Sequence, residues 1–468
     1  MCGILPVRIG AGVTPHGKTA DAPYSKLRPH AGGGRPPTES TTNGSRRTPA
    51  EGQCGLPLRG CVAITNPKRQ PVLPVPPLFR VAPLLDFPFL MMHSAGTMDK
   101  RYAIADTSDL ITPGLVLFQD ILEQNLDRMI ALAGSPARLR PHCKTHKMAE
   151  VTRLELARGI TRHKCATLAE AEMLAQAGAT DIFLAYNIVG ANLARVVEFG
   201  RRFPAVQLLV TADHPKAIAQ LGAVVSAAGQ SVGVLLDLDV GQHRTGVPAG
   251  PAAVALYRQI AATPGLRPEG LHVYDGHQHQ KVLAERVAAI DAEWGAVEAL
   301  HRELLAAGLP VPRLVCGGTG SFPVYAAKSD PAIELSPGTC VFHDAGYTET
   351  FPDLVFPPAV LILTRVISRP TADRVTLDLG YKAVASDPPA GRRLTLPDLP
   401  DAEQVLQNEE HLVIRTAEAG RFEPGDELLA VPRHVCPTLA LHRAVNVIRN
   451  GRVAEQWSVV ARDRWITL

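Results

Sequence analysis

One short motif in this sequence combines two lysines with histidine, cysteine and threonine after an apolar run. It reads Arg-Pro-His-Cys-Lys-Thr-His-Lys over residues 140–147, with the lysines at positions 144 and 147. Burial disfavours a charged amine, so a lysine taken out of water has a lowered pKa and can form a Schiff base with a carbonyl cofactor. The alternative is that Lys144 and Lys147 only begin a solvated helix. Spacing alone leaves both interpretations open.

Two later turns combine glycine with hydroxyl side chains. The first is Cys-Gly-Gly-Thr-Gly at residues 316–320, and the second is Ser-Pro-Gly-Thr at residues 336–339. Backbone N–H groups in such turns, together with a threonine hydroxyl, can approach phosphate oxygens closely. A glycine pair alone usually marks only a turn. Together with a lysine, however, these turns predict pyridoxal 5′-phosphate, because that cofactor presents an aldehyde at one end and a phosphate at the other.

A further pair of residues, His434 and Cys436, has side chains that bind metals. The surrounding pattern predicts a strand, where residues two apart point to the same face, so imidazole and thiolate could share one metal ion. Two protein ligands leave coordination positions open, as in catalytic rather than structural centres. The alternative, which is the commoner origin of such a pair, is a buried cysteine beside a capped histidine.

The elements that must position these residues follow a regular alternation between residues 107 and 345. Eight strand-like runs are separated by amphipathic helices such as Gln119–Ala133, and this pattern predicts an α/β fold, a (β/α)8 barrel. The expected strands are residues 138–144, 163–167, 182–186, 206–212, 232–240, 270–275, 313–317 and 333–342. Residues at the C-terminal ends of barrel strands face the active site, where Lys144 and both glycine turns fall. A doubly wound open sheet is the alternative, but no glycine-rich dinucleotide fingerprint follows the first strand.

Two regions flank the predicted barrel. Short β-type runs broken by proline, glycine and aspartate fill residues 346–468, so we expect a smaller β-rich domain that carries His434 and Cys436. The strand near residues 115–118 can pack with it. Residues 1–97 are rich in proline, glycine, arginine, serine and threonine without periodicity, which predicts a disordered extension. Methionines at positions 91, 92 and 98 offer later start sites.

Composition limits the possible partners and compartments. A net charge of +3 over 468 residues gives no reason to expect nucleic acid or an anionic membrane as a partner. The eight cysteines form no CxxC pair or regular framework, no apolar stretch is long enough to span a bilayer, and the first residues lack a secretory pattern. We therefore expect a cytoplasmic protein with reduced cysteines.

From about residue 112 to 461, the chain resembles the D-threonine aldolase and D-serine dehydratase family, whose members have an alanine-racemase-type (fold type III) barrel and a C-terminal β domain. The matching motifs occur in order along the chain. They are RPHCKTHK (140–147), LAEAEMLAQAG (168–178), LDVGQHRTGV (238–247), YDGH (274–277), GGTG (317–320), LSPGTCVFHDA (335–345), YKAVASD (381–387), EEH (409–411) and HVCPT (434–438).

This resemblance implies a role for each matched residue. Lys144 would carry pyridoxal 5′-phosphate, and His434 and Cys436 would bind zinc or manganese beside the β-hydroxyl of the substrate. Arg244 would lie near the phenolic oxygen of the cofactor, Tyr274 would line its ring, and the phosphate would be held by Gly318, Thr319, Gly338 and Thr339. Relatives often have Gly-Ser where Tyr381 precedes a lysine, which could alter the substrate pocket. The resemblance also implies a homodimer.

The implied reaction is cleavage of a β-hydroxy-D-amino acid by a lyase. We favour retro-aldol cleavage to glycine and an aldehyde, and the alternative is a D-serine dehydratase that releases pyruvate and ammonia. One lysine on one face of the cofactor would explain selectivity for a single enantiomer. A racemase needs a second base on the other face, and none can be identified from the sequence. A non-catalytic protein that binds pyridoxal 5′-phosphate would resemble the barrel alone, so the β domain argues against it.

Overall fold

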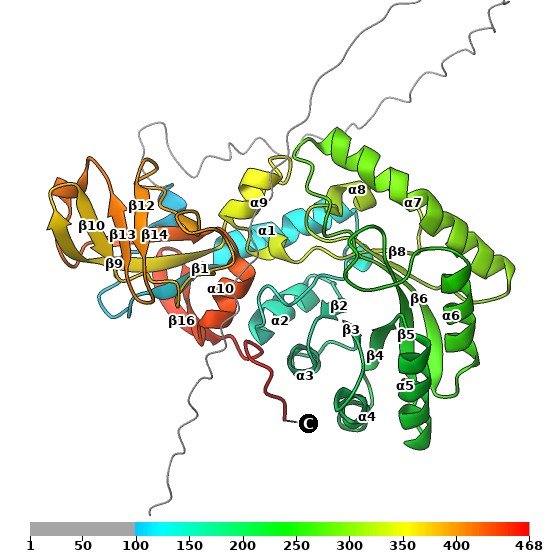
Figure 1. Ribbon diagram of the computed structural model, residues 1–468. Coiled ribbons are helices and arrows are strands. Elements are labelled where there is room, and N and C mark those ends of the chain that lie inside the picture. Colours follow the sequence, from blue (N-terminus) through cyan, green and yellow to red (C-terminus); the bar gives the residue numbers. More distant parts are fainter. Residues whose placement is uncertain (1–98, 468) are drawn as a thin grey trace, which may run out of the picture. The chain divides into compact units, whose positions relative to one another are not determined.

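The computed structural model describes residues 99–467. The predicted disordered extension, residues 1–97, lies outside the described residues. Two β-sheets organise the described part of the chain (Figure 1). One is a barrel sheet with surrounding helices, and the other is a β-rich sheet on the opposite side of α1 and α10 in that view.

The barrel sheet has seven parallel strands in sequential order. They are β2 (Arg162–Cys165), β3 (Asp181–Asn187), β4 (Gln207–Ala212), β5 (Val232–Leu238), β6 (Leu266–Val273), β7 (Leu314–Cys316) and β8 (Ile333–Leu335). A small apolar cluster of its own is formed by side chains of β3, β4, β5 and β7, namely those of Phe183, Leu209, Leu235 and Val315. Such a packed interior is typical of a barrel of this kind.

Residues 139–143 occupy the eighth position of the barrel. Leu139 forms a parallel bridge with Leu335 of β8, and His142 forms one with Lys164 of β2. Backbone hydrogen bonds extend both contacts, with Arg140 N donating to Leu335 O at 2.8 Å and Lys164 N donating to Pro141 O at 2.9 Å. The predicted (β/α)8 barrel is therefore confirmed.

Two predicted strands differ from the structure. Residues 138–144 form only the isolated bridges just described, since Pro141 has no N–H to donate to a continuous ladder. The run predicted over 333–342 ends at Leu335, because Pro337 interrupts it in the same way and residues 339–341 turn into a 3₁₀ helix. Both departures fall where the chain must turn to build the mouth of the barrel.

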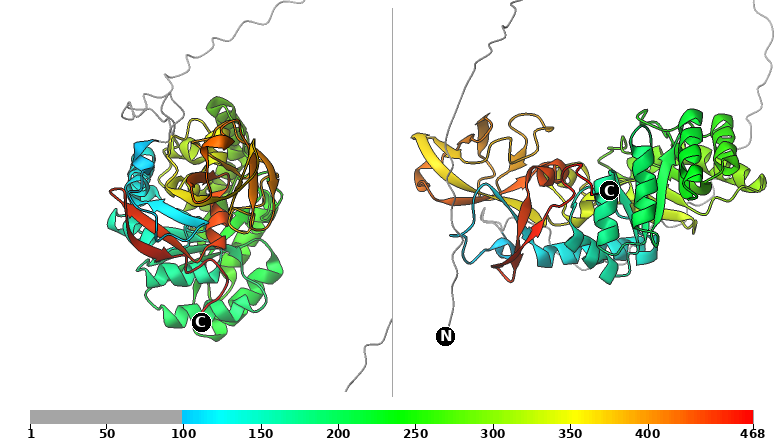
Figure 2. Two further views of the ribbon diagram at one scale, coloured as in Figure 1. Left: turned by 90° about the vertical axis from the view of Figure 1, so that its left-hand side faces the viewer. Right: turned by 90° about the horizontal axis from the view of Figure 1, so that it is seen from below.

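Helices follow the barrel strands on the outside, as Figures 1 and 2 show. They are α2 (Ala149–Ala157), α3 (Leu168–Gln176), α4 (Asn192–Arg202), α5 (Pro215–Ala227), α6 (Pro251–Ala262), α7 (Leu283–Ala306) and α8 (Phe322–Ala326), and α1 (Gln119–Ala133) precedes them. Their ends follow local sequence. Thr167 accepts a hydrogen bond from Glu170 N at the start of α3, and α1 ends at Gly134, whose φ of 80° suits glycine.

The second sheet has the strand order β12–β13–β10–β9–β1–β15–β16, with β14 paired to β9 and β11 paired to β14. Its strands are β1 (Gly114–Phe118), β9 (Val360–Thr371), β10 (Arg374–Leu377), β11 (Leu394–Thr395), β12 (Glu403–Gln407), β13 (Leu412–Arg415), β14 (Glu427–Pro432), β15 (Ala444–Arg449) and β16 (Arg452–Ser458). Strand β1 precedes the barrel in sequence but lies between β9 and β15, so the chain joins this sheet both before and after the barrel.

Two short helices lie near the candidate site. Helix α9 (Ala345–Thr350) joins the barrel to the second sheet, and α10 (Val435–Leu441) lies between β14 and β15 of the second sheet. The buried carboxylate of Asp344 accepts hydrogen bonds from Tyr347 N at 2.8 Å and from Val435 N at 2.9 Å, so it caps both helices. Burial raises the pKa of Asp344 to about 7, and these N–H groups oppose that rise. Among residues 99–467, no helix has the length and apolarity that a bilayer crossing requires.

Candidate active site

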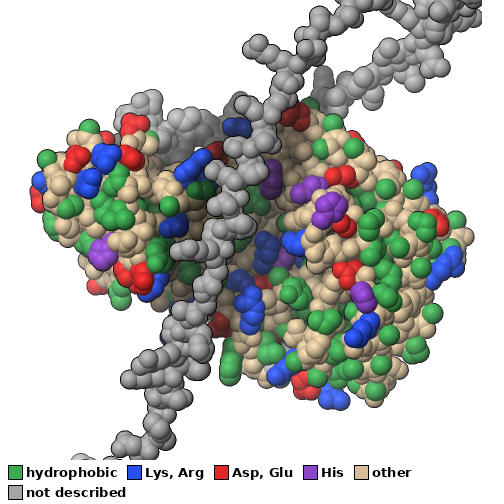
Figure 3. Space-filling model, in the orientation of Figure 1, with side chains coloured by type: hydrophobic (Ala, Val, Ile, Leu, Met, Phe, Trp, Pro, Cys, Tyr) green, Lys and Arg blue, Asp and Glu red, His purple; other side chains and the backbone are tan. Residues whose placement is uncertain are grey.

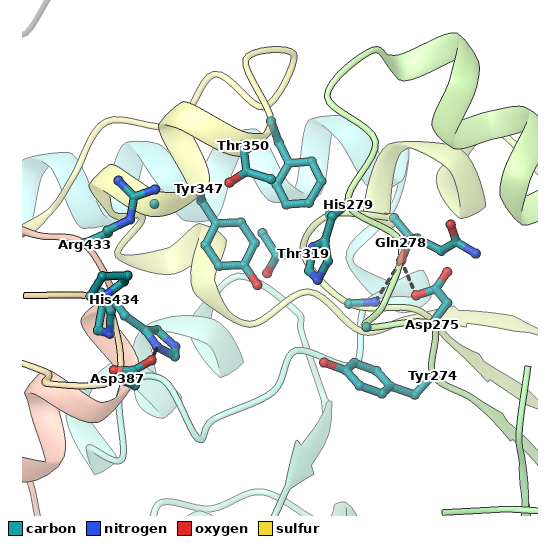
Figure 4. Close-up of a pocket in the computed structure, with 18 residues that line it drawn as sticks. Tyr274, Asp275, Gln278, His279, Thr319, Tyr347, Thr350, Asp387, Arg433 and His434 are labelled. Carbon is teal, nitrogen blue, oxygen red and sulfur yellow. Dashed lines mark hydrogen bonds and ion pairs between the residues drawn. The ribbon is translucent and has the colours of Figure 1, made fainter. Parts of the chain in front are cut away.

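A cavity of about 340 Å³, here called the mouth cavity, opens where the barrel strands end. It is lined by residues that follow β6 and β7, by α9, and by segments of the β-rich part, among them Tyr274, Gly318, Thr319, Tyr347, Asp387 and His434. Tyr274 and Tyr347 direct their hydroxyls into the cavity, with Thr319 between them (Figure 4). In the space-filling view, Lys, Arg and His side chains gather around the hollow between the two sheets (Figure 3).

The two glycine turns lie side by side. Thr319 Oγ1, from the turn after β7, accepts hydrogen bonds from Gly338 N at 3.1 Å and Thr339 N at 2.9 Å in the turn after β8. Gly317 has a φ of 68°, and a Cβ added at Gly338 would make a tight contact of 3.1 Å with His142 O. Glycine is therefore favoured where the turns meet the segment that leads to Lys144. This close-packed cradle of backbone N–H groups fits a phosphate.

The N–H groups of this cradle already have acceptors within the protein. Gly338 N and Thr339 N donate to Thr319, and Gly318 N donates to Ser321 Oγ at 3.0 Å. Ser321 Oγ donates in turn to the buried carboxylate of Asp275 at 2.7 Å. The structure thus brings the predicted phosphate residues together, and their contacts to a phosphate stay a prediction.

Lys144 follows the barrel segment 139–143, and its side chain is partly buried. The nearby Cys436 thiolate raises the pKa of the Lys144 amine, an effect that outweighs the opposing effect of burial. The expectation that burial lowers the pKa of this lysine is therefore wrong for the protein without ligands. The sequence argument considered burial alone, whereas the fold adds a negative partner from a distant part of the chain.

Cys436 lies at the junction of the barrel and the β-rich part. Its Sγ is 3.2 Å from Thr145 Oγ1 and 3.6 Å from Thr339 Oγ1. Burial by itself would raise the pKa of the thiol, but the Lys144 ammonium and His434 outweigh burial and lower it to about 6. Lys144, one phosphate turn and Cys436 thus form a single cluster.

The prediction that His434 and Cys436 lie on a strand is wrong. Strand β14 ends at Pro432, His434 caps the N-terminus of α10, and Cys436 is the second residue of that helix. A proline at the strand end and the Asp344 carboxylate at Val435 N favour the turn into a helix. Both side chains still lie at the barrel mouth. The reason is that the start of α10 faces the mouth, and not the alternation of side chains along a strand.

Asp387 is a site residue that the sequence reasoning did not assign. Its Oδ2 lies 2.5 Å from His434 Nδ1. Burial lowers the pKa of His434, but Cys436 and Asp387 outweigh that effect and raise the pKa to about 9. Asp387 closes the motif YKAVASD, so the available signal was an acidic residue at the end of a matched motif.

The donor chemistry fits a metal ion with open positions. Because Asp387 contacts Nδ1 of His434, Nε2 of this histidine remains available as a metal ligand, and Cys436 supplies a sulfur ligand. Within residues 99–467, no group of three or more His, Cys, Asp or Glu side chains is arranged to hold a metal. An imidazole and a thiolate are two ligands, which would leave positions open for substrate or water.

Arg244 and Tyr274 form the remaining part of the predicted site. Arg244 follows β5, and its guanidinium carbon lies 4.7 Å from the centre of the Tyr274 ring. Tyr274 follows β6 and lines the mouth cavity. All residues predicted from the sequence thus lie around the barrel mouth, contributed by the ends of five barrel positions and by α10.

Comparisons with known proteins agree with this architecture. Residues 118–345 match the alanine racemase N-terminal domain, and residues 359–448 match a serine dehydratase domain. The D-threonine aldolase of Arthrobacter sp is 34% identical over 360 residues, which are 75% of this chain and 92% of that protein.

Two solved structures are similar along nearly their whole length. D-threonine aldolase from Filomicrobium marinum is 31% identical, has a TM-score of 0.71, and aligns over 76% of this chain and 96% of its own. A mutant of D-threo-3-hydroxyaspartate dehydratase, described as being in the metal-free form, is 25% identical, with a TM-score of 0.67 over 75% and 97% of the two chains. The fold, the paired domains and the extent of the match to D-threonine aldolase show that this chain belongs to the D-threonine aldolase and D-serine dehydratase-like family of alanine-racemase-type barrel enzymes.

Proposed function

We propose that this protein is a lyase that acts on β-hydroxy-D-amino acids with pyridoxal 5′-phosphate and a divalent metal, zinc or manganese, and that it cleaves them to glycine and an aldehyde. One observation carries the proposal. The amine of Lys144 and the sulfur of Cys436 share a cluster in which each shifts the pKa of the other. The amine that would carry the cofactor therefore lies beside a donor that would hold the metal.

The cofactor, when bound, supplies an electron sink for negative charge that develops at the Cα atom of an amino acid. The chain supplies the attachment and the orientation. Lys144 would be the amine for the aldehyde, the turns at Thr319 and Thr339 would hold the phosphate, and Tyr274 lines the mouth cavity.

The second half of the site would act on the β-hydroxyl group. Asp387 fixes the imidazole of His434 through Nδ1, which leaves Nε2 for the metal. Cys436, two residues later in the first turn of α10, offers a sulfur. A metal held there would acidify a hydroxyl group or help it depart as a Lewis acid. Because Lys144 and this pair come from different elements, the cofactor and the metal could address adjacent carbons of one substrate.

The relatives include both kinds of reaction. The similarity to the D-threonine aldolases of Arthrobacter sp and Filomicrobium marinum supports cleavage of the Cα–Cβ bond by this chain. The similarity to D-threo-3-hydroxyaspartate dehydratase supports elimination instead. The metal-free description of one mutant of that dehydratase supports a metal in this chain's site as well. The pair His434 and Cys436 resembles the dehydratase type of metal site, whereas the higher identity to D-threonine aldolase favours cleavage, which we keep as the first candidate.

Product analysis tests this proposal directly. The purified protein, loaded with pyridoxal 5′-phosphate and Mn²⁺ or Zn²⁺, is incubated with D-threonine and separately with D-serine, each with and without a chelator. Glycine and acetaldehyde from D-threonine are expected, and the chelator should abolish them. Pyruvate and ammonia from D-serine would instead establish the dehydratase. Turnover that the chelator leaves unchanged would contradict the metal site.

The expected homodimer and the cytoplasmic location remain predictions of the sequence. Size-exclusion chromatography with light scattering would test the first.

A further inference from the structure

A second lysine lies beside the candidate attachment site. Lys164 is the last residue but one of β2, and its backbone pairs with His142, two residues before Lys144. The residue is only 2% exposed. Among residues 99–467, no hydrogen bond or ion pair holds its amine; instead, aromatic rings surround it, with Nζ 5.8 Å from the centre of Phe183 and 5.5 Å from the centre of Tyr274.

The electrostatic surroundings of Lys164 are unfavourable for its charged form. Burial lowers the pKa of Lys164 to about 7, Lys144 and Arg244 add repulsion, and Asp237 and Cys316 oppose these effects. Asp237 is already engaged, since its Oδ1 lies 2.7 Å from His272 Nδ1. His272 Nε2 is itself buried without a partner. His142 completes the group of titratable residues that face this amine.

Such an arrangement costs stability in the protein without ligands. Lys164 is almost fully buried as a residue, and native proteins rarely retain a lysine in such a place without an acceptor unless it serves a site. Two cationic side chains, Lys164 and Arg244, lie over the Tyr274 ring, and the charge of Lys144 also acts on Lys164. Lys144 has the Cys436 thiolate as its counter-charge, whereas no anion contacts the amine of Lys164 among the described residues. This side of the mouth therefore lacks an anion.

The order of elements around the barrel indicates which anion this is. The phosphate turns follow β7 and β8, the next position is the segment that leads to Lys144, and the next strand is β2 with Lys164. On the ring of pyridoxal 5′-phosphate, the phosphate arm, the aldehyde and the phenolic oxygen are attached to three successive carbons. If the phosphate lay over β7 and β8 and the aldehyde at Lys144, the phenolic oxygen would come next, on the side of β2.

We propose that Lys164 is a positioning residue that binds the phenolic oxygen of the cofactor as an anion, sharing it with Arg244. The inference rests on the proposed function only in that the cofactor is attached at Lys144. The phenolate would supply the missing counter-charge, so Lys164 would be neutral in a large part of the apoprotein and protonated in the holoprotein. A charge-assisted hydrogen bond to a buried oxygen is the strong kind, and it would hold the ring in one orientation.

The experiment compares three variants of the full chain with wild type. Lys164→Met keeps the length of the side chain without its charge, Lys164→Arg keeps the charge, and Lys216→Met changes an exposed lysine on α5 as a matched control. Apoprotein prepared by removal of the cofactor is titrated with pyridoxal 5′-phosphate, and the absorbance band of the attached cofactor is followed against pH. Thermal melting of each apoprotein is measured in parallel.

Three results are expected for Lys164→Met. The affinity for pyridoxal 5′-phosphate falls by about tenfold or more, as for the loss of a hydrogen bond to a charged group. The pH midpoint of the absorbance band rises, because the phenolate and the groups linked to it lose a stabilising cation. The apoprotein melts at a higher temperature than wild type, since an unpartnered amine is gone. Lys164→Arg retains most of the affinity and the band, and Lys216→Met matches wild type in every measurement.

Several outcomes would overturn the inference and leave the proposed function intact. An unchanged affinity and spectrum in Lys164→Met would remove the cofactor as the partner of this amine. If the affinity for D-3-hydroxyaspartate, but not for D-threonine, then fell, the partner would be a carboxylate of the substrate. A lower melting temperature of the apoprotein, or equal losses in the Met and Arg variants, would indicate a structural role. By contrast, a cofactor band that survives in Lys144→Ala would contradict the proposed function itself.

Discussion

The segment that carries Lys144 and strand β2 with Lys164 are neighbours in the barrel. The pKa values of their two lysines are nevertheless shifted in opposite directions. The pKa of Lys144 is raised because the Cys436 thiolate lies close by, and the pKa of Lys164 is lowered because burial and two cations outweigh Asp237. Both amines belong to the mouth of one barrel, where Lys164 is buried and Lys144 partly buried. Burial alone therefore does not determine the protonation of a lysine here; the partner contributed by a distant segment does.

The comparison also separates two ways of preparing a site for a ligand. Lys144 has its counter-charge within the protein and is protonated until the metal site or the cofactor changes that balance. Lys164 has none and would gain one from the ligand. A site that contains both has one amine stabilised before binding and one that is stabilised by binding.

The largest expected effect comes from removing the first amine. Lys144→Ala should lose the absorbance band of the attached cofactor and reduce turnover of D-threonine by about 10⁴-fold, because attachment and proton transfer are both removed. Spectra and initial rates measure these changes, with Lys216→Ala as the control that keeps both. Retention of the band would show that another amine carries the cofactor, with Lys164 the first candidate.

Removing the partner of Lys144 is the next test. Cys436→Ser should reduce turnover by more than about a hundredfold and lower the bound metal measured by elemental analysis, because one of two donor side chains becomes a weak ligand. Cys165→Ala, which changes another buried thiol on β2, serves as the control and should keep the metal. Equal metal content and turnover in both variants would refute the assignment of Cys436 as a ligand.

The carboxylate behind the histidine should have a smaller effect. Asp387→Asn keeps the size of the side chain but weakens the hold on His434 Nδ1, so metal affinity should fall by about 10- to 100-fold. Titration of the metal-depleted protein with Mn²⁺ or Zn²⁺ measures this, and excess metal should restore turnover. A loss that excess metal does not restore would point to a different role for Asp387.

The smallest effect concerns the pH dependence of stability. The folded pKa of Lys164, about 7, lies below the ordinary lysine value of 10.5, so between these limits the unfolded chain binds more protons than the folded one. This group therefore makes the apoprotein more stable as the pH rises through that window, by up to about 1.4 kcal/mol per pH unit. Below about pH 7 its destabilising effect is complete and constant.

Denaturant unfolding of the apoprotein at several pH values tests the sign. The difference in unfolding free energy between Lys164→Met and wild type should shrink as the pH rises from about 7 towards 10, with Met the more stable at the lower end. A difference that stays constant with pH would show that Lys164 has an ordinary pKa in the folded protein, which would remove its contrast with Lys144.

Much of the fold was accessible from the sequence because it depends on local pattern. Helix α1 matches its predicted bounds, and the barrel strands other than the first and last are close to theirs. The misplaced elements, residues 138–144, 333–342 and 434–436, contain or follow a proline and build the mouth. There hydrogen bonds to partners distant in sequence, such as Val435 N to Asp344, decide the conformation.

The candidate site divides in the same way. Residue types and motifs in the sequence were sufficient to single out Lys144, Arg244, Tyr274, the glycine turns, His434 and Cys436, since the chemistry of a side chain is a property of its type. Only the tertiary structure brought Cys436 to Lys144, added Asp387 to His434, and left Lys164 without a partner. Charges act through space rather than along the chain, so which amine is protonated, and which waits for a ligand, is decided by the fold.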